Sequence, residues 1–243
     1  MLHKTRAVVL RQIKYSESSI IVQVFTELFG RQSYIVSGVR SKKSNSKINL
    51  FQTLHFVDME VYNKPKRELQ RIKEAKSLFQ FNSIDIDPIK STQAIFLAEV
   101  ILKSIREEEK DPNLFEFLYN SVQLFDLLTK NYVNFHLIFL IHFTRFLGFS
   151  PEDNYNELNN YFDLRAGRFY DSPPLHNEYI SEDQSYLFHE LLSTSLNDSF
   201  SIAMSSKIRS KLLEHILDYY YLHISGMPKI KSHIVFTEMF SGL

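Results

Sequence analysis

The first 36 residues contain three short runs rich in β-branched side chains, and this feature restricts the possible folds more than any other. The runs cover residues 7–13, 19–25 and 32–36, and they are joined by a polar connector, residues 14–18, and by a turn that contains Gly30. Strands this short with such tight connections are typical of an antiparallel meander. The sequence therefore predicts that the chain begins with a small all-β unit.

Two later segments extend this unit. Residues 53–62 alternate apolar side chains with Asp58 and Glu60, which predicts a strand. Residues 63–66 have the composition of a turn. Residues 68–79 also fit helical spacing, but their place after a hairpin turn favours a strand. Five strands in about 80 residues match a small Greek-key barrel of the oligonucleotide-binding (OB) type.

The period of the apolar residues changes from that of strands to that of helices after residues 82–88. Helices are expected at residues 89–109, 111–128, 132–149, 182–196 and 205–224, whereas the polar residues 154–174 break the helical pattern. The fold class is therefore α+β. An OB-fold barrel in residues 1–80 precedes an all-α helical domain in residues 81–243, with an irregular excursion, which includes a short hairpin, around residues 150–175.

The formal net charge of zero conceals an asymmetry. Residues 1–80 carry 15 Lys and Arg against 6 Asp and Glu, and residues 81–243 carry 13 against 22. A basic part joined to an acidic part suggests a polyanion-binding module attached to a different surface. A solvated surface without a partner is the alternative, but an excess of nine positive charges in 80 residues favours nucleic acid.

Basic side chains form two clusters in the predicted β unit, one in the Ser-rich loop after residue 38 and one across the turn after residue 62. Cations at this density can follow a phosphate backbone by releasing its counterions, without reading bases. Exposed Tyr34, Phe56 or Tyr62 could stack on bases, although each is more often a core residue. The candidate DNA-binding residues are Arg6, Arg11, Arg31, Arg40, Lys42, Lys43, Lys47, Lys64, Lys66, Arg67 and Arg71.

The sequence gives little support for catalysis. The absence of cysteine excludes disulfides, thiolate metal sites and a cysteine nucleophile. No nucleotide-binding or hydrolase motif occurs, and the nine histidines are scattered. The N-terminus lacks a signal peptide, and the apolar stretch of residues 135–149 is too short to span a bilayer. We expect a cytoplasmic protein that is not an enzyme, binds no metal or other cofactor and does not enter membranes.

Several positions at fixed spacing resemble the N-terminal signature of the bacterial recombination mediator family RecO. The matching residues are Thr5-Arg6-Ala7-Val8-Val9-Leu10, Tyr15-Ser16-Glu17, Ser19-Ile20, Phe25-Thr26, Gly30 and Gly38-Val39-Arg40-Ser41-Lys42. Weaker similarities follow at residues 146–149 and 228–232. The resemblance therefore spans the chain, and its specific part covers about the first 80 residues.

The resemblance implies an OB-fold barrel, a helical domain and a role in DNA repair without enzymatic activity. Members of the family bind single- and double-stranded DNA and anneal complementary strands. With RecR, and with RecF in many bacteria, they help to load RecA onto DNA coated by the single-stranded DNA-binding protein SSB. Their helical domain takes up the C-terminal tail of SSB. The alternative is an OB-fold protein associated with RNA or the ribosome, without a repair function.

This chain departs from the family at one site. Many members hold zinc with four cysteines in the excursion between helices, and this chain has no cysteine. We expect the excursion to be held by aromatic packing around Tyr161, Phe162, Phe169 and Tyr170. For the SSB tail, which ends in apolar residues and a carboxylate, the helix at residues 132–149 supplies an apolar wall, and His136 or Arg145 would supply the charge.

Overall fold

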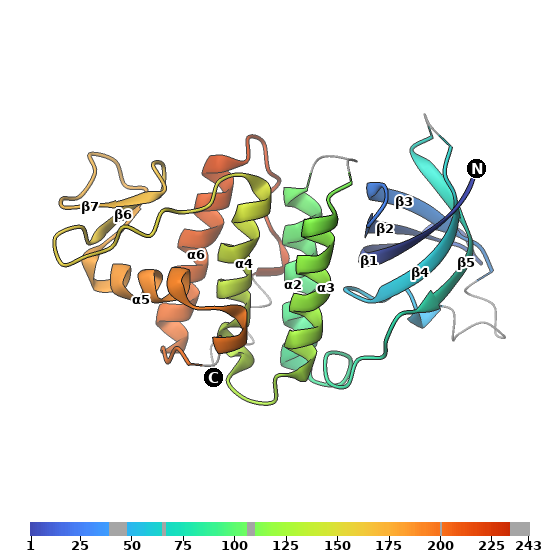
Figure 1. Cartoon of the computed structure of the whole chain (residues 1–243), viewed down its shortest axis with the longest axis horizontal. Helices are drawn as coiled ribbons and strands as arrows, with labels where there is room; N and C mark the ends of the chain where they lie inside the picture. Colours follow the sequence, from blue (N-terminus) through green and yellow to red (C-terminus); the bar gives the residue numbers. More distant parts are fainter. Residues whose placement is uncertain (39–47, 65–66, 106–109, 200, 234–243) are drawn as a thin grey trace. The chain divides into compact units, whose positions relative to one another are not determined.

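The computed structural model describes residues 1–38, 48–64, 67–105, 110–199 and 201–233. The chain forms two compact units, Met1–Asp126 and Leu127–Leu243. The first contains the strands β1–β5 with the helices α2 and α3, and the second contains α4, α5, α6 and a small sheet (Figure 1).

The strands of the first unit close into a barrel in the order β1-β2-β3-β5-β4. The pair β3–β5 is parallel, and the other described pairs are antiparallel. The strands are β1 (Leu2–Lys14), β2 (Ile20–Thr26), β3 (Gly30–Val36), β4 (Phe56–Tyr62) and β5 (Leu69–Ser77). The predicted OB-type barrel is confirmed, and so is the strand, rather than helix, within residues 68–79.

The long strand β1 closes the barrel because it pairs with two neighbours. Residues 2–8 pair with β4, and residues 7–14 pair with β2. A bulge between Val9 and Arg11 bends the strand between these partners. Alternate residues of the strands point inward and, with Phe51, form the barrel core. The core residues are Ala7, Val9, Ile20, Val22, Val24, Tyr34, Val36, Phe51, Val57, Met59 and Val61.

Helices α2 (Pro88–Ser104) and α3 (Pro112–Leu127) pack with the barrel in one unit. Asp87 caps α2 by accepting hydrogen bonds from the backbone N–H groups of Ile89 and Lys90, and Pro88 stands at the first helical position, where its missing N–H costs nothing. The helix α2 contacts β1. The compact unit that contains the barrel thus extends to Asp126. The predicted domain boundary after residue 80 stays a prediction.

A buried carboxylate ties the segment before α2 to the end of α3. Asp126 accepts hydrogen bonds from the backbone N–H groups of Asn82 (2.8 Å), Ser83 (2.9 Å) and Ile84 (3.0 Å). The ammonium of the buried Lys90 donates to Ser83 Oγ at 2.6 Å. Because both charges are matched by polar partners, the contact can be buried between helices.

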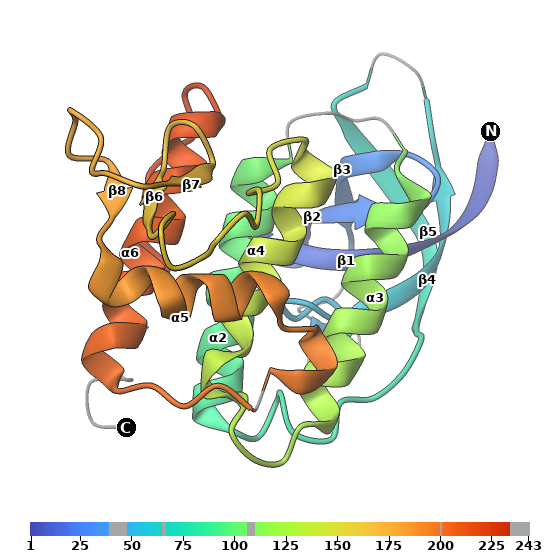
Figure 2. The same cartoon turned by 60° about the vertical axis from the view of Figure 1, so that its left-hand side comes forward.

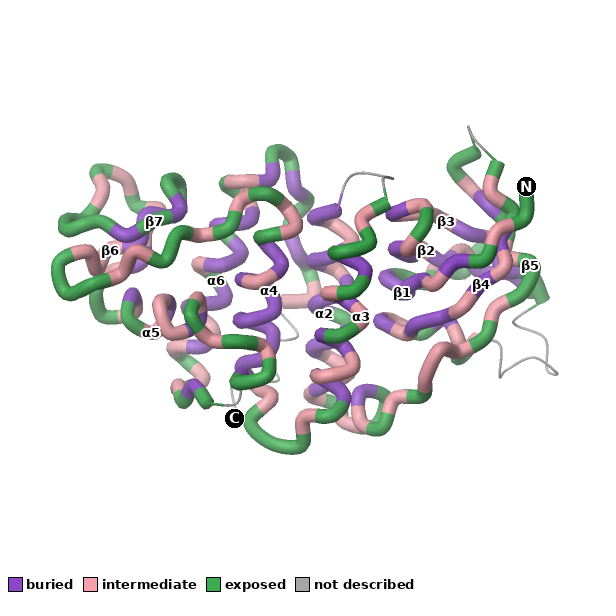
Figure 3. The backbone as a smooth tube through the Cα atoms, viewed as in Figure 1, coloured by how far each residue is buried: buried purple, intermediate pink, exposed green. Residues whose placement is uncertain are grey.

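In the second unit, α4 (Phe135–Leu147), α5 (Glu182–Ser193) and α6 (Ser206–His223) pack together, and Figure 2 shows α5 crossing the other two. Short 3₁₀ turns at Tyr132–Asn134 and Leu196–Asp198 precede α4 and follow α5. The helix α4 is buried along most of its length (Figure 3). The helix ends at Gly148, whose φ of 82° favours glycine.

The excursion contains one more short strand than the sequence predicts. The expected hairpin is present as β6 (Tyr161–Asp163) and β7 (Arg168–Tyr170), and a third strand, β8 (Tyr179–Ile180), joins β6. The expected excursion with a hairpin is therefore confirmed, and β8 is the strand that the sequence did not predict. The sheet is completed by β8, which follows the hairpin in the sequence and pairs with β6 rather than with its neighbour β7. Local composition does not reveal such a pairing.

Aromatic packing holds this small sheet, as predicted, with buried rings on one face and a contact between Tyr161 and Tyr179, whose ring centroids are 6.2 Å apart, on the other. The rings of Phe162 and Phe169 are buried, with centroids 4.9 Å apart, and Phe188 of α5 lies 4.5 Å from Phe162. Tyr170 points the other way and is 40% exposed. Polar contacts complete the structure, because the buried Asp163 accepts hydrogen bonds from two backbone N–H groups of its turn and contacts His176 Nε2 at 3.2 Å.

Candidate nucleic-acid interface

The outward surface of the barrel is divided between a covered half and an open half. On the covered half, Val8 pairs with both Phe25 and Phe56, and all three are buried. Rings of α3 cover this row, since Phe115 and Tyr119 lie 6.1 Å and 5.2 Å from Phe56. This half is therefore closed to a ligand.

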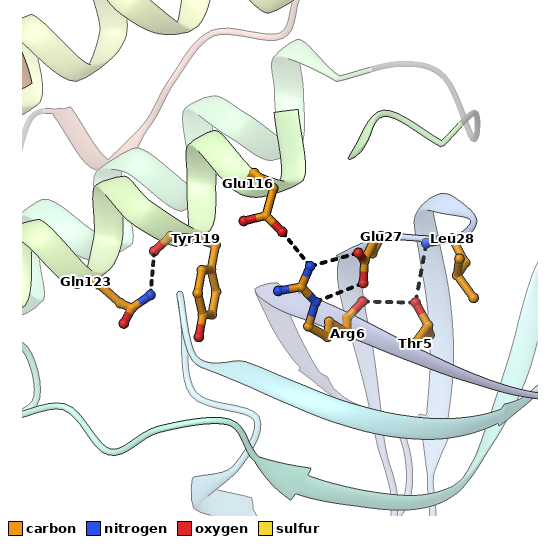
Figure 4. A network of polar contacts seen from close by, with 7 residues as sticks. All are labelled: Thr5, Arg6, Glu27, Leu28, Glu116, Tyr119 and Gln123. Carbon is orange, nitrogen blue, oxygen red and sulfur yellow. Dashed lines mark hydrogen bonds and ion pairs between the residues drawn. The ribbon is translucent and has the colours of Figure 1, made fainter. Parts of the chain in front are cut away.

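Arg6 lies at the edge of the covered half and is engaged by acidic partners. Its Nε donates to Glu27 Oε2 at 2.8 Å and its Nη2 to Glu27 Oε1 at 2.7 Å, and it also pairs with Glu116 of α3 (Figure 4). The guanidinium lies 5.0 Å from the ring centroid of Phe115 and 5.5 Å from that of Tyr119. This geometry favours a structural role for Arg6 over the predicted contact with DNA.

A row of paired outward-facing residues crosses the open half of the barrel. Ile13 of β1 pairs with Ile21 of β2, Ile21 with Ile35 of β3, Ile35 with Arg71 of β5, and Arg71 with Tyr62 of β4. A second row, Arg11-Gln23-Ser33-Leu69, runs beside it. We define the open face as Arg11, Ile13, Ile21, Gln23, Ser33, Ile35, Tyr62, Leu69 and Arg71, all partly or fully exposed.

Sequence reasoning missed the isoleucines of this face. The alternation of β2 and β3 puts Ile21 and Ile35 on the parity opposite to the core valines, and that signal was present in the sequence. Which part of the outward-facing surface stays open to solvent depends on where the helices pack. Faces of this kind on strands 2 and 3, with the loops beside them, are where OB folds bind oligonucleotides.

Cations stand at both ends of the open face. Arg11 is exposed at one end and Arg71 at the other, where the turn between β4 and β5 adds exposed Lys64 and Arg67. The buried side chain of Gln70 fixes this turn by donating to the carbonyls of Lys64 and Arg67, both at 2.8 Å, and by accepting from the N–H of Lys64 at 3.0 Å. Within the described ranges, no carboxylate pairs with these four cations.

A groove of about 600 Å³ lies beside this end of the face, between β3, β5 and residues 50–51. Tyr62, which is 43% exposed, lines it together with Ile35 and Arg71. Of the three aromatic residues proposed for stacking, only Tyr62 is accessible. Tyr34 and Phe56 are buried, the first in the barrel core and the second under α3, so the stacking role considered for those two was wrong.

Three other lysines of the barrel are neutralised by their neighbours. Lys73 and Lys4 flank Glu60 at 2.9 Å and 3.7 Å, and Lys76 lies 3.3 Å from Asp58. The pKa of Glu60 is lowered, chiefly by the hydrogen bond from Lys73. The predicted basic surface is therefore uneven, and its free cations gather at the ends of the open face.

The remaining predicted cations differ in position. Arg31 pairs with the buried Phe25 in the β2–β3 ladder and donates to the carbonyl of Leu102 at 3.3 Å, so it lies on the covered half. Five others lie outside the described residues. They are Arg40, Lys42, Lys43, Lys47 and Lys66.

The two residues proposed for the SSB tail do not form one site. His136 is fully buried, and burial, aided by the charge of Arg209, lowers its pKa to about 3. It is therefore neutral near pH 7 and cannot attract a carboxylate. Arg145 is exposed, nine residues further along α4, which places it about 180° around the helix. The choice of His136 as a source of charge was wrong, because a nearly all-apolar helix buries its polar residues too.

Two negative findings apply to the described residues. No helix among them is both long and apolar enough to cross a membrane. No group of three or more His, Cys, Asp or Glu side chains among them could hold a metal ion.

Comparison with known proteins covers the chain almost completely. The family model described as "Recombination protein O N terminal" matches residues 1–81, and "Recombination protein O C terminal" matches residues 86–233. The DNA repair protein RecO of Azobacteroides pseudotrichonymphae genomovar. CFP2 is 38% identical over 240 residues, which cover 99% of this chain and 100% of that protein. Proteins with the same name from Bacteroides fragilis and Flavobacterium psychrophilum are each 39% identical, over 241 and 240 residues. These cover 99% and 98% of this chain, and 100% and 99% of those proteins.

Proposed function

This chain belongs to the RecO family of DNA repair proteins, and from that premise we propose that it is a recombination mediator that binds single-stranded DNA on the open face and anneals complementary strands. The proposed partners are single- and double-stranded DNA, RecR, the SSB tail and, where present, RecF. With RecR it helps to load RecA onto SSB-coated DNA. It acts without a catalytic centre and without a cofactor.

One observation carries this proposal: the open face has free cations at its ends and isoleucines at its centre. Arg11, Arg71 and the two exposed cations of the β4–β5 turn can neutralise phosphates and release counterions. The two turn cations are Lys64 and Arg67. Ile13, Ile21 and Ile35 offer apolar contact but no aromatic ring on which a base would be held. A strand bound in this way keeps its position through its backbone while its base edges remain available.

Annealing follows from the same arrangement. Two complementary strands repel each other through their phosphates until pairing begins. A protein that neutralises part of each backbone lowers this repulsion, and weak contact with the bases lets them exchange partners. Tight stacking of every base would oppose annealing, so the isoleucine row suits a mediator better than a storage protein for single strands.

The acidic part of the chain, residues 81–243, is a poor surface for DNA and suits protein partners instead. Arg145 is the remaining candidate for a charge that meets the carboxylate of the SSB tail. It is exposed on α4, the most apolar helix of the second unit. The partners RecR and RecF are proposed from the family alone.

The test is the salt dependence of single-stranded DNA binding, measured by fluorescence anisotropy with a labelled oligonucleotide. Arg71→Glu is compared with Lys76→Glu, which makes the same charge change on the same strand at a lysine already paired with Asp58. We expect Arg71→Glu to weaken binding and to reduce the log–log salt slope by about 0.7, the value for one phosphate contact on single strands. Lys76→Glu should change the slope little.

Three outcomes decide the matter. Equal effects of the two substitutions would remove the open face as the binding site. No binding by the unsubstituted protein at low salt would overturn DNA binding itself. Preference for an unlabelled RNA competitor of the same sequence would favour the alternative function in RNA or ribosome association, since phosphate contacts serve both polymers.

A further inference from the structure

The turn between β1 and β2 presents an aromatic side chain to solvent beside the open face. Tyr15 is 58% exposed, and among the described residues no other ring lies against it. It follows Lys14, the last residue of β1, and Ile13, the first member of the isoleucine row, stands two residues before it. Tyr62 occupies the corresponding corner at the other end of that row.

The backbone beneath Tyr15 is held by a local hydrogen-bond network. The N–H groups of Tyr15 and Ser16 both donate to the carbonyl of Ser19 at 3.1 Å. The N–H of Ser19 donates to Ser16 Oγ, also at 3.1 Å. A ring carried on a turn fixed in this way loses only side-chain freedom when a ligand stacks on it, and the entropic cost of binding is small.

The charges of the hairpin separate a site for phosphates from a site for bases. Arg11 and Lys14 are exposed on the strand, whereas Glu17 is exposed at the tip. A carboxylate repels phosphate but accepts hydrogen bonds from the exocyclic amino groups of cytosine and adenine. The tip, with Tyr15 and Glu17, therefore suits a base, and the strand below it suits the backbone.

We propose that Tyr15 is a base-stacking residue that contacts single-stranded nucleic acid where it enters or leaves the open face. This inference rests on the proposed function and deepens it, because it adds an aromatic contact at the edge of a face whose centre holds bases weakly. A single stacked base fixes the register of the strand and leaves its neighbours free to pair. The other exposed ring, Tyr62, bounds the same face at the far corner.

The chain contains no tryptophan, so Tyr15→Trp places a single tryptophan, which can be excited selectively over tyrosine, at the proposed contact. We expect the emission of this variant to be quenched as an oligodeoxycytidylate is added at low salt, in parallel with binding measured by anisotropy. Tyr186→Trp is the matched control, because Tyr186 is similarly exposed, at 53%, but lies on α5 in the second unit. Its emission should not change.

Affinity provides a second readout. Tyr15→Phe keeps the ring and should bind like the unsubstituted protein, whereas Tyr15→Leu should bind roughly 5- to 150-fold more weakly, as expected for one lost stacking contact. Unchanged emission from the Tyr15→Trp variant, together with normal binding by Tyr15→Leu, would overturn the inference. If Arg71→Glu still weakened binding in that case, the proposed function would stand. Absence of binding by the unsubstituted protein would overturn both.

Discussion

The guanidinium of Arg6 lies 5.0 Å from the ring centroid of Phe115. This contact joins β1 of the barrel to helix α3. Glu27 and Glu116 hold the same guanidinium through ion pairs. The pKa of the Glu27 carboxyl is lowered, first by its hydrogen bonds with Arg6. A residue that the sequence presents as part of a DNA-binding surface thus stabilises the packing of α3 on the barrel.

Substitution of Arg6 should therefore affect stability and not DNA binding. We expect Arg6→Met to lower the free energy of unfolding by about 1–2 kcal/mol, because a partly buried bidentate ion pair and a cation–π contact are lost. Urea unfolding measures this loss. Arg71→Met removes one positive charge from the open face. It should weaken DNA binding and leave the free energy of unfolding nearly unchanged. A loss of DNA affinity in folded Arg6→Met as large as that in Arg71→Met would contradict the assignment.

The Asp126 contact predicts a specific acid sensitivity. Burial would raise the pKa of its carboxyl, but hydrogen bonds from the N–H groups of Asn82, Ile84 and Ser83 outweigh burial and lower the pKa below the ordinary 3.8. Because the folded pKa lies below the unfolded one, the carboxylate stabilises the fold fully above about pH 4 to 5 and progressively less as the pH falls through the folded pKa.

The variant Asp126→Asn isolates this contribution. Its free energy of unfolding at pH 7 should be about 1–3 kcal/mol lower than that of the unsubstituted protein, because the amide keeps only one acceptor oxygen for the N–H groups. The difference in the free energy of unfolding between the two proteins should shrink below pH 4. All other titratable groups are the same in both proteins, so their contributions cancel in this difference. A difference that stays constant from pH 7 to pH 3 in urea unfolding would show that the charge of Asp126 does not matter.

We expect the excursion to be stable without metal. The chain has no cysteine, and Asp163 holds the β6–β7 turn through hydrogen bonds from the N–H groups of Arg165 (2.7 Å) and Ala166 (3.0 Å). The melting temperature should be unchanged by a chelator, whereas Asp163→Ala should lower it. Elemental analysis that finds zinc near one equivalent per chain, lost together with stability on chelation, would refute this prediction.

The loop cations remain a prediction from the sequence. Reversal of Arg40, Lys42 and Lys43 to Glu should abolish nucleic-acid binding and leave the far-ultraviolet circular dichroism spectrum unchanged. The physical reason is the loss of three phosphate contacts and the addition of three repulsive charges. Undiminished binding by the folded variant would confine the interface to the described open face.

Local patterns in the sequence located the strands of the barrel and the long helices, but not every strand and not the contacts between elements. The alternation in residues 19–25 and 32–36 located β2 and β3, because a strand shows its period within a few residues. The third strand of the excursion, β8, was missed because its pairing with β6 joins segments about 17 residues apart. Stacking roles for Tyr34 and Phe56 failed for a related reason, since exposure depends on what packs above a residue.

The sequence by itself determined that this protein has a basic β-barrel before a helical region, since periodicity, turn residues and the distribution of charge are local properties. Only the tertiary structure decided which basic residues are free. Arg6 and Arg11 lie on β1 and Arg31 lies on β3 of the same barrel, yet only Arg11 stands on the open face. The packing of two helices on half of the barrel made that difference, because a charge is available to a ligand only where no protein partner has already neutralised or covered it.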